Sequence, residues 1–444
     1  MAVRSFPSGP PALSGFRGMT NFATLPGFLN RIAIRYGPIA SWKMFRTRVY
    51  FINEAGAIDR LLTADGYVVL KGRGIRKLRR LLGMGLLTSD EPLHLRQRRL
   101  VQPAFHRERI AGYAATMIAF TREATAGLVS GEIVAVDQLM NRLTLRIAAN
   151  TLLSADVDDD SDTIGSALTA ALDTFPQALA PFGELLDLLS WHPVTRRARA
   201  ARARLDGVIY RLIEERRAEG TDHGDLLSIL LASRDEEGNA MPDDLVRDEA
   251  LTLLLAGHET TANALTWTLD ALARDPAVEA RLHAELDAVL GDREATPADA
   301  MALPYTRSII SEALRMRPPA WILGRGLRSD FALLDYDLPA GSAVICSPLV
   351  THRNPAYWQQ PDAFRPERWT NGETDNLPRG AYFPFGGGNR VCIGEGFAWT
   401  EGVLLLAGLA RRHRFVLTDP TDVPLDPSVT LRPGRPVMLR VEDR

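Results

Sequence analysis

Cys392 lies in the segment of the sequence with the clearest chemical signature. It follows three consecutive glycines and Arg390 in the run Phe-Gly-Gly-Gly-Asn-Arg-Val-Cys-Ile-Gly, residues 385–394. Glycines allow tight turns and a close approach of the backbone to a flat ligand. A helical pattern begins directly after the run, so backbone N–H groups and the helix dipole favour a thiolate at Cys392. One thiolate with an open coordination position suits haem iron, and Arg390 supplies a cation for an acidic ligand group.

For an arbitrary cysteine, the alternative is a buried structural residue beside a glycine-rich turn. The ordered spacing of Phe, Gly, Arg, Cys and Gly favours a ligand for Cys392. The other cysteine, Cys346, lies in an apolar, strand-like run and is predicted to be a core residue. A chain with two cysteines cannot form a disulfide scaffold, and it cannot supply the four thiolates of an all-cysteine zinc or iron–sulfur site.

A second unusual segment, Ala-Gly-His-Glu-Thr-Thr at residues 256–261, interrupts an otherwise apolar helical stretch. Gly257 removes a side chain, which weakens the helix and lets a bulky group approach. A threonine hydroxyl can bond to the carbonyl four residues earlier and bend the helix. Taken alone, Glu259 and Thr260 slightly favour a satisfied polar pair in the core.

A third pattern, Glu312-Ala-Leu-Arg315, places opposite charges three residues apart and therefore on one face of a helix. Exposed pairs of this kind are common and contribute little to stability. The pattern by itself predicts no function.

The run at residues 385–394 resembles the haem-ligand loop of the cytochrome P-450 family, FxxGxRxCxG, at every defined position. Residues 256–261 are similar to the oxygen-activation motif of the same family, [AG]-G-x-[DE]-T-[TS]. The resemblance implies that Cys392 is the axial thiolate of haem b. It also implies that Glu259 and Thr260 form an acid–alcohol pair that delivers protons to the reacting oxygen.

The resemblance extends to a structural charge cluster. Glu312 and Arg315 match the ExxR helix of the family. The run Phe-Arg-Pro-Glu-Arg-Trp at residues 364–369 is similar to the family segment that supplies a further arginine, here Arg368. These three residues are expected to form a buried triad that supports the ligand loop without taking part in chemistry.

Haem carries two propionates, so cations from separate segments are expected to converge on them. Residues 94–98 resemble the WxxxR helix of the family, with His94 in place of the usual tryptophan. An imidazole can still donate a hydrogen bond to a carboxylate. The resemblance therefore implies propionate contacts from His94, Arg98, Arg325 and Arg390, and for each arginine the alternative is a surface position.

The elements that must position these residues are mostly helical. Helical patterns dominate from Leu93 to Met316, and the longest, from about Asp243 to Arg274, carries the segment 256–261. Other patterns predict a strand pair within residues 39–53, an arginine-rich helix over about 195–217, short strands after residue 318 and a helix over about 395–412.

The fold class expected is mainly α with a minor β part. Residues 1–25 contain several prolines and are predicted to be an irregular N-terminal lead-in. No repeat or linker divides the remainder, so residues 26–444 are expected to form a single cytochrome P-450 haem domain. The resemblance, which runs from about Tyr36 to Phe415, implies a triangular prism with haem between the long central helix and the helix after the cysteine-ligand loop.

Composition excludes several classes of protein. Of the 444 residues, 46% are hydrophobic and 24% are charged, which is incompatible with global disorder. The net charge of -2 argues against a nucleic-acid partner held by overall positive charge. No segment has the roughly 20 consecutive apolar residues of a membrane span, and the N-terminus lacks the apolar stretch of a signal peptide. We therefore expect a cytoplasmic protein without a membrane anchor.

The activity that the resemblance implies is that of a haem-thiolate monooxygenase. Such an enzyme inserts one atom of O2 into a hydrophobic small molecule, here a terpenoid, fatty acid or polyketide-like compound, by hydroxylation or epoxidation. The segments expected to face the substrate are mostly apolar: residues 82–87, residues 174–189, the helix face near Leu253 and Ala256, and residues 320–322. Apolar segments are equally typical of an ordinary core.

The electrons must come from another protein, because the family resemblance occupies nearly the whole chain and two cysteines cannot hold a [2Fe–2S] cluster. We expect a separate ferredoxin or flavodoxin with its reductase. It is predicted to dock on the Cys392 side against basic residues: Arg76, Lys77, Arg79, Arg80, Arg96 and Arg99.

Two alternative functions remain open. One is a peroxide-using or isomerising haem-thiolate enzyme, and the other is a non-catalytic haem-binding sensor or carrier. The pair Glu259 and Thr260 argues against both, because neither function needs an acid–alcohol relay.

Overall fold

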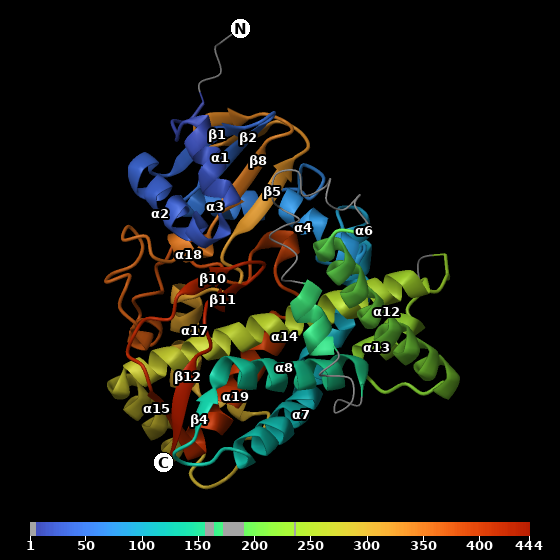
Figure 1. The fold of residues 1–444 in the computed structure, drawn as a ribbon, viewed down its shortest axis with the longest axis vertical. Coiled ribbons are helices and arrows are strands. Elements are labelled where there is room, and N and C mark those ends of the chain that lie inside the picture. Colours follow the sequence, from blue (N-terminus) through green and yellow to red (C-terminus); the bar gives the residue numbers. More distant parts are fainter. Residues whose placement is uncertain (1–5, 156–163, 172–190, 235–236) are drawn as a thin grey trace.

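The computed structural model describes residues 6–155, 164–171, 191–234 and 237–444. Helices form most of this part of the chain, and the strands are gathered in small sheets (Figure 1). One sheet lies at the end of the molecule that holds the N-terminal helices, and another lies among helices at the opposite end, beside the C-terminus (Figure 1). The predicted fold class, mainly α with a minor β part, is confirmed.

The α-helices of the described residues vary widely in length. They are α1 (Ala12–Thr20), α2 (Leu25–Tyr36), α3 (Ala55–Leu62), α4 (Arg73–Lys77), α5 (Arg79–Leu82), α6 (Leu93–Val101), α7 (Arg107–Ala126), α8 (Val136–Leu153), α12 (Pro193–Glu219), α13 (Leu226–Ala232), α14 (Asp243–Arg274), α15 (Pro276–Val289), α16 (Asp299–Ala302), α17 (Pro304–Met316), α18 (Pro348–Thr351) and α19 (Glu395–Arg412). Short 3₁₀ turns are η1 (Phe22–Thr24), η2 (Gln102–Phe105), η3 (Pro366–Trp369) and η4 (Gly388–Arg390).

The main sheet has the strand order β1-β2-β8-β5-β3, and a second sheet has the order β4-β12-β9. Two hairpins, β6-β7 and β10-β11, complete the strands of the described residues. The strands are β1 (Ile39–Met44), β2 (Thr47–Ile52), β3 (Val69–Lys71), β4 (Ile133–Ala135), β5 (Leu323–Leu327), β6 (Phe331–Leu333), β7 (Tyr336–Leu338), β8 (Ala343–Cys346), β9 (His413–Leu417), β10 (Leu425–Pro427), β11 (Leu431–Pro433) and β12 (Met438–Asp443). The predicted strand pair within residues 39–53 is confirmed as β1 and β2.

Helix α14 crosses the middle of the molecule (Figure 1) and packs against α8, α12, α17 and α19. Its bounds, Asp243 and Arg274, are those that the sequence predicts. Asp243 and Asp244 stand in its first turn and Arg274 in its last, which complements the helix dipole. Because neighbours surround it, nearly every residue between Val246 and Leu272 is buried, including several polar ones.

The prediction of an irregular lead-in over residues 1–25 is wrong for residues 12–24, where α1 and η1 form. Pro11 stands directly before α1, at a position where a missing N–H costs little. Gly15 is buried against Trp42 of β1, and a Cβ atom at Gly15 would lie 2.3 Å from the indole ring. Packing of α1 onto β1 therefore outweighs the low helix propensity of its glycines.

The predicted charge triad is present and fully buried. Oε1 of Glu312 accepts hydrogen bonds from Nη2 of Arg315 at 2.8 Å and from Nε of Arg368 at 3.0 Å. Oε2 accepts from Nε of Arg315 at 2.9 Å and from the indole N–H of Trp369 at 3.0 Å. None of the three charged side chains is more than 1% exposed. The carboxylate thus joins α17 to the segment around η3.

A continuous set of hydrogen bonds leads from the triad towards the segment that precedes Cys392. Nη1 of Arg315 donates to the carbonyl of His352 at 2.9 Å. The ring of His352 accepts from the backbone N–H of Phe383 at 2.9 Å, and the Phe383 carbonyl accepts from the N–H of Gly386 at 3.0 Å. Burial lowers the pKa of His352 to about 3, so the ring is a neutral acceptor at physiological pH. The triad can therefore support the ligand loop as predicted.

Arg368→Ala should lower the free energy of unfolding by about 3–5 kcal/mol, because Glu312 would keep its buried charge with one cation fewer. The measurement is chemical denaturation of the purified protein. Arg365→Ala is the matched control on the same segment, since its side chain pairs with Glu373 in a partly exposed position and should cost at most about 1 kcal/mol. Equal costs for the two variants would contradict a buried triad.

Candidate active site

The loop around Cys392 is a tight turn that requires its glycines. Gly386 and Gly388 have φ angles of 75° and 62°, a region that favours glycine. A Cβ atom at Gly388 would also lie 2.2 Å from the carbonyl oxygen of Leu62. The N–H of Cys392 donates to the carbonyl of Phe385 at 2.9 Å, which closes the turn, and α19 begins three residues after Cys392.

Cys392 is exposed by surface area, yet protein groups surround it closely enough to desolvate the thiol. This combination is typical of a residue in the wall of an internal cavity. Desolvation raises the pKa of Cys392 to about 11, and the N–H of Gly394 and the charge of Arg98 only partly oppose it. The prediction that the helix N-terminus makes Cys392 a thiolate is therefore wrong for the chain alone. A bound metal ion deprotonates a coordinating thiol, so the site fits a thiolate ligand when metal is present.

Cys346, in contrast, is a core residue as predicted. It lies in β8 with no exposed surface, and burial raises the pKa of its thiol to about 12.

Arg98 of α6 reaches the cysteine loop. Its Nη1 donates to the carbonyl of Val391 at 2.8 Å, immediately before Cys392. Partial burial lowers the pKa of Arg98, whereas Arg96 and Arg99 on the same helix are exposed. The sequence-based choice of Arg98 among the three arginines agrees with this geometry.

Arg325 faces a second buried cation that sequence reasoning missed. Arg325 in β5 is 8% exposed and stands directly opposite Lys71 of β3, which is 7% exposed. Like charges opposite each other in a sheet are destabilising. Burial, and then the charge of Arg325, lowers the pKa of Lys71 well below its usual value. A usable signal existed in the sequence, because Lys71 is one of three lysines in the chain and follows an apolar run.

Arg390 adds a third cation to this group. Its Nη1 donates to the carbonyl of Ser89 at 3.0 Å, while Nε and Nη2 are buried without a hydrogen-bond partner in the described part of the chain. The carboxylates of Asp90 and Glu91 lie 3.8 and 3.7 Å from Nη2, too far for a hydrogen bond. Unpartnered guanidinium atoms in a buried place favour an additional anion at this position.

His94 is buried on α6, with Nδ1 2.9 Å from Oε1 of Glu91. Burial, and then the charges of Arg390 and Lys71, lowers the pKa of His94 to about 4, so the ring is neutral at physiological pH. A neutral imidazole has one N–H, and in this structure it donates its hydrogen bond to the Glu91 carboxylate. Donation from His94 to a propionate remains a prediction and would require that this hydrogen bond be exchanged.

The motif at residues 256–261 has one accessible face. Ala256 is exposed and Thr260, one turn later, is partly exposed, although both lie in the middle of the otherwise buried α14. The hydroxyl of Thr260 donates to the carbonyl of Ala256 at 2.7 Å, the back-bond that the sequence predicts. These two residues therefore border an opening on this side of the helix.

Glu259 points elsewhere, towards the segment between β10 and β11. Its Oε1 accepts a hydrogen bond from the hydroxyl of Thr430 at 2.8 Å, and that hydroxyl accepts one from Asn263 at 3.2 Å. Glu259 is 6% exposed. Thr430 and Asn263 are polar partners that sequence reasoning missed, since a lone Thr in a C-terminal turn carries no distinguishing pattern.

Glu401 is a buried carboxyl group that the sequence did not indicate. It has no exposed surface, and neither of its oxygens has a hydrogen-bond partner in the described residues. The neighbouring hydroxyl of Thr261 donates its hydrogen to the carbonyl of Gly257 at 3.2 Å. Desolvation raises the pKa of Glu401 to about 8, and the nearby Thr261 hydroxyl opposes this shift only in part.

Two adjacent acidic residues of α14 hold the loop that contains residues 82–87. Asp248 Oδ2 accepts from the N–H of Met84 at 2.6 Å, and Glu249 Oε2 accepts from the N–H of Leu86 at 3.0 Å. Burial raises the pKa of Glu249 to about 8. The loop is thereby fixed on α14 about two turns before the motif at residues 256–261.

The other segments predicted to face the substrate have different outcomes. Residues 174–189 lie outside the described residues. Trp321 is wrong as a substrate contact, because its ring has no exposed surface and its N–H donates to the carbonyl of Ser428 at 3.1 Å. Ala320 and Ile322 are partly exposed, and Leu253 is 6% exposed.

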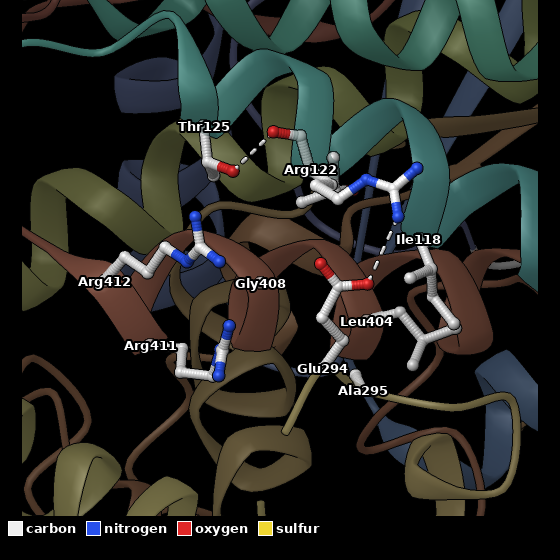
Figure 2. Close-up of a pocket in the computed structure, with 10 residues that line it drawn as sticks. Ile118, Arg122, Thr125, Glu294, Ala295, Leu404, Gly408, Arg411 and Arg412 are labelled. Atoms are coloured by element: carbon white, nitrogen blue, oxygen red, sulfur yellow. Dashed lines mark hydrogen bonds and ion pairs between the residues drawn. The ribbon is translucent and has the colours of Figure 1, made fainter. Parts of the chain in front are cut away.

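A small pocket lies between α7 and the C-terminal half of α19 (Figure 2). Beside it, Arg122 pairs with Glu294 at 3.4 Å, and the hydroxyl of Thr125 donates to the carbonyl of Arg122 at 2.9 Å. Its volume of about 30 Å³ is that of one water molecule. Gly408 of this pocket is thirteen residues beyond the start of α19, roughly 20 Å along the helix axis. The pocket is therefore separate from the site around Cys392.

The residues around Cys392 fit a haem group. Three buried cations, Lys71, Arg325 and Arg390, stand near two carboxylates, Asp90 and Glu91. Asp90 also pairs with Arg79 at 3.0 Å, which leaves an excess of positive charge. An anionic group such as a propionate would neutralise this excess and supply acceptors for the unpartnered Arg390 atoms.

The fold and this donor set define the class of protein as a haem-thiolate oxygenase. A family model described as cytochrome P-450 matches residues 7–440, so the chain belongs to that family. Members bind haem b through a cysteine thiolate. The protein is thus an oxidoreductase that incorporates an oxygen atom from O2 into a hydrophobic substrate and uses redox partners.

Three curated relatives are similar along most of their length. Cyclooctatin synthase of Streptomyces melanosporofaciens is 38% identical over 431 residues, 96% of this chain and 92% of the relative. Cyclooctat-9-en-7-ol 5-monooxygenase of the same organism is 36% identical over 90% of this chain and 85% of its own. Pentalenene oxygenase of Streptomyces avermitilis is 34% identical over 93% of this chain and 90% of its own.

In the described residues, no helix combines the length and the apolar character that crossing a bilayer requires.

Glu401→Gln should stabilise the protein more at high pH than at low pH. The pKa of Glu401 is raised from 4.5 to about 8, so the folded protein holds a proton that the unfolded chain releases. Stability consequently falls as the pH rises from about 4.5 to about 8, and the neutral amide removes this loss. The measurement is the free energy of unfolding against pH. Glu132→Gln, at an exposed position, is the control, and parallel pH profiles for wild type and Glu401→Gln would contradict the expectation.

Proposed function

We propose that Cys392 is the axial ligand of the haem iron, and that Lys71, Arg98, Arg325 and Arg390 hold the propionates. The observation that carries this proposal is the pairing of an accessible, desolvated thiol with a buried excess of positive charge beside it. When bound, haem supplies the activation of O2 and the transfer of one oxygen atom to the substrate, while the other atom leaves as water.

The protons are proposed to pass through Glu259 and Thr260. Thr260 lies on the accessible face of α14, and its hydroxyl can turn from the Ala256 carbonyl to donate into the opening. Glu259 accepts a hydrogen bond from Thr430 at 2.8 Å, so the proposal requires its carboxylate to turn from Thr430, take up the next proton and return it to the Thr260 hydroxyl.

The proposed substrate is a terpenoid. Two of the relatives carry names that specify an oxygenation of cyclooctat-9-en-7-ol and of pentalenene. An apolar surface around Leu253 and Ala256 and the fixed loop at residues 82–87 are compatible with a bulky hydrocarbon.

The proposed electron donor is a ferredoxin or a flavodoxin with its reductase, and the proposed compartment is the cytoplasm, where such reductases are supplied with reduced nicotinamide. The predicted basic docking residues lie on α4, α5 and α6, and α6 reaches the cysteine loop through Arg98. Arg79 is the least available of them, because it binds Asp90 and the carbonyl of Thr88. Arg80, Arg96 and Arg99 are exposed.

A spectral-shift screen of lipophilic compounds tests the substrate class. We expect cyclic terpene hydrocarbons and terpene alcohols to displace the water ligand of the iron and shift the Soret band. Shifts from long-chain fatty acids alone would contradict the terpenoid assignment.

Cys392→Ala should abolish the red-shifted Soret band of the reduced, carbon-monoxide-treated protein, because no other thiol is available as ligand. The measurement is the difference spectrum at equal haem content. Cys346→Ala, which changes a buried thiol in β8, should keep that band. Its loss in both variants, or its retention in Cys392→Ala, would refute the ligand assignment.

Thr260→Ala should retain haem but lower the ratio of product to O2 consumed several-fold, with hydrogen peroxide released, because one proton donor is lost. Thr266→Ala is a matched control. Its hydroxyl makes the same type of back-bond, to the carbonyl of Ala262 at 2.8 Å, but is fully buried. An unchanged ratio in Thr260→Ala would exclude this threonine from the proton relay, and equal uncoupling in both variants would indicate a general effect on the helix.

A further inference from the structure

The N-terminal part of the chain has a charge distribution unlike that of the whole. Residues 1–53 contain no Asp or Glu, whereas the complete sequence is slightly acidic with a net charge of -2. The basic residues of this part are Arg4, Arg17, Arg31, Arg35, Lys43, Arg46 and Arg48. The remainder of the chain therefore carries a net negative charge, whereas residues 1–53 carry a net positive charge.

The structure describes all of these basic residues except Arg4, and it gathers the described ones at one end of the molecule, where α1, α2, β1 and β2 pack together (Figure 1). Arg17, Arg31 and Arg35 line a groove of about 700 Å³ between α1 and α2. All three are exposed, and none makes an ion pair with any residue that the structure describes. The local charge is consequently uncompensated.

Large apolar side chains protrude among the same cations. Leu13 of α1 is 63% exposed, Ile34 of α2 is 78% exposed, and Phe45 in the β1–β2 turn is 69% exposed. The rings of Phe16 and Phe45 meet at 5.2 Å, so α1 and the turn form one continuous surface. Ile34 lines the groove together with Arg17, which continues this surface onto α2.

Exposed aliphatic and aromatic side chains beside unpaired cations match the chemistry of an anionic lipid bilayer. Basic side chains are attracted to the phosphate groups, and apolar side chains enter the boundary between headgroups and acyl chains. An acidic protein or a polyanion would form ion pairs with the cations, but its binding would be stabilised little by three protruding apolar side chains. The acidic remainder of the chain is repelled by the same membrane, which favours one orientation.

We propose that α1, α2 and the β1–β2 turn form a docking surface for the anionic surface of a lipid bilayer. Arg17, Arg31 and Arg35 pair with lipid phosphates, and Leu13, Ile34 and Phe45 insert between the headgroups. This surface acts without a spanning helix, and its binding to lipid is independent of haem chemistry.

Sedimentation of the haem-containing, full-length protein with vesicles tests the proposal. We expect binding to vesicles of equal parts phosphatidylglycerol and phosphatidylcholine, and much weaker binding to pure phosphatidylcholine. The affinity should fall with added salt because the cations act at the membrane surface. No binding to the anionic vesicles, or equal binding to both vesicle types, would overturn the proposal.

Two triple variants distinguish binding through this surface from a general effect of the protein's net charge. The triple variant Arg17→Gln, Arg31→Gln, Arg35→Gln should weaken binding to the anionic vesicles by about tenfold or more. A control with the same change of net charge replaces three exposed arginines elsewhere: Arg142, Arg379 and Arg412. It should bind within about twofold of wild type, and an equal loss in both triples would overturn the proposal. Unchanged circular dichroism and haem absorbance show that each variant is folded.

The apolar contribution distinguishes a membrane from a polyanion. The double variant Leu13→Ser, Phe45→Ser should bind the anionic vesicles several-fold more weakly than wild type, with the difference persisting at high salt. Its binding to heparin should equal that of wild type. If the double variant binds vesicles as tightly as wild type, the surface recognises an acidic macromolecule and the lipid proposal is wrong.

Discussion

The buried carboxylate of Glu312 is the interaction on which the candidate site most depends. Its two oxygens accept hydrogen bonds from the side chains of Arg315, Arg368 and Trp369 and from the backbone N–H of Arg365. These donors lie in α17 and in the segment around η3. A buried charge is tolerated only when its partners are complete. The carboxylate therefore fixes the relative position of two distant segments, and through His352 it holds the backbone that leads into the cysteine loop.

The candidate cofactor site shows the opposite electrostatic condition, because its charges are not balanced within the chain. Lys71 and Arg325 oppose each other across two strands, and Arg390 has buried N–H groups that find no acceptor among the residues the structure describes. Such an arrangement costs free energy in the protein alone. Binding of an anionic ligand offsets this cost, because the ligand supplies the missing acceptors and negative charge. The raised pKa of Cys392 also indicates a missing ligand, because the thiolate becomes favourable when a metal ion binds to it. These features support the proposal that the site holds a group that supplies both negative charge and a metal ion.

Buried carboxyl groups along α14 and α19 form a further pattern. Glu249 and Glu401 both have pKa values raised to about 8 by desolvation, on either side of the motif at residues 256–261. Glu249 anchors a loop through a backbone N–H, whereas Glu401 has no hydrogen-bond partner in the described residues. Because these groups are protonated at neutral pH, the central helix can remain closely packed in spite of its polar content.

The sequence alone was enough to identify the family, to place α14, α19 and the strand pair of residues 39–53, and to find the triad of Glu312, Arg315 and Arg368. It also led to the proposals for Cys392 and Arg98. These features follow from local spacing, because a motif or a helical period is written in consecutive residues. The contacts of the folded chain were needed to establish that α1 forms in a proline-rich lead-in, that Trp321 is a core residue, that Glu259 contacts Thr430, and that Lys71 lies opposite Arg325. Each of these depends on segments distant in sequence that come together in space, and burial in such contacts determines both pKa and conformation.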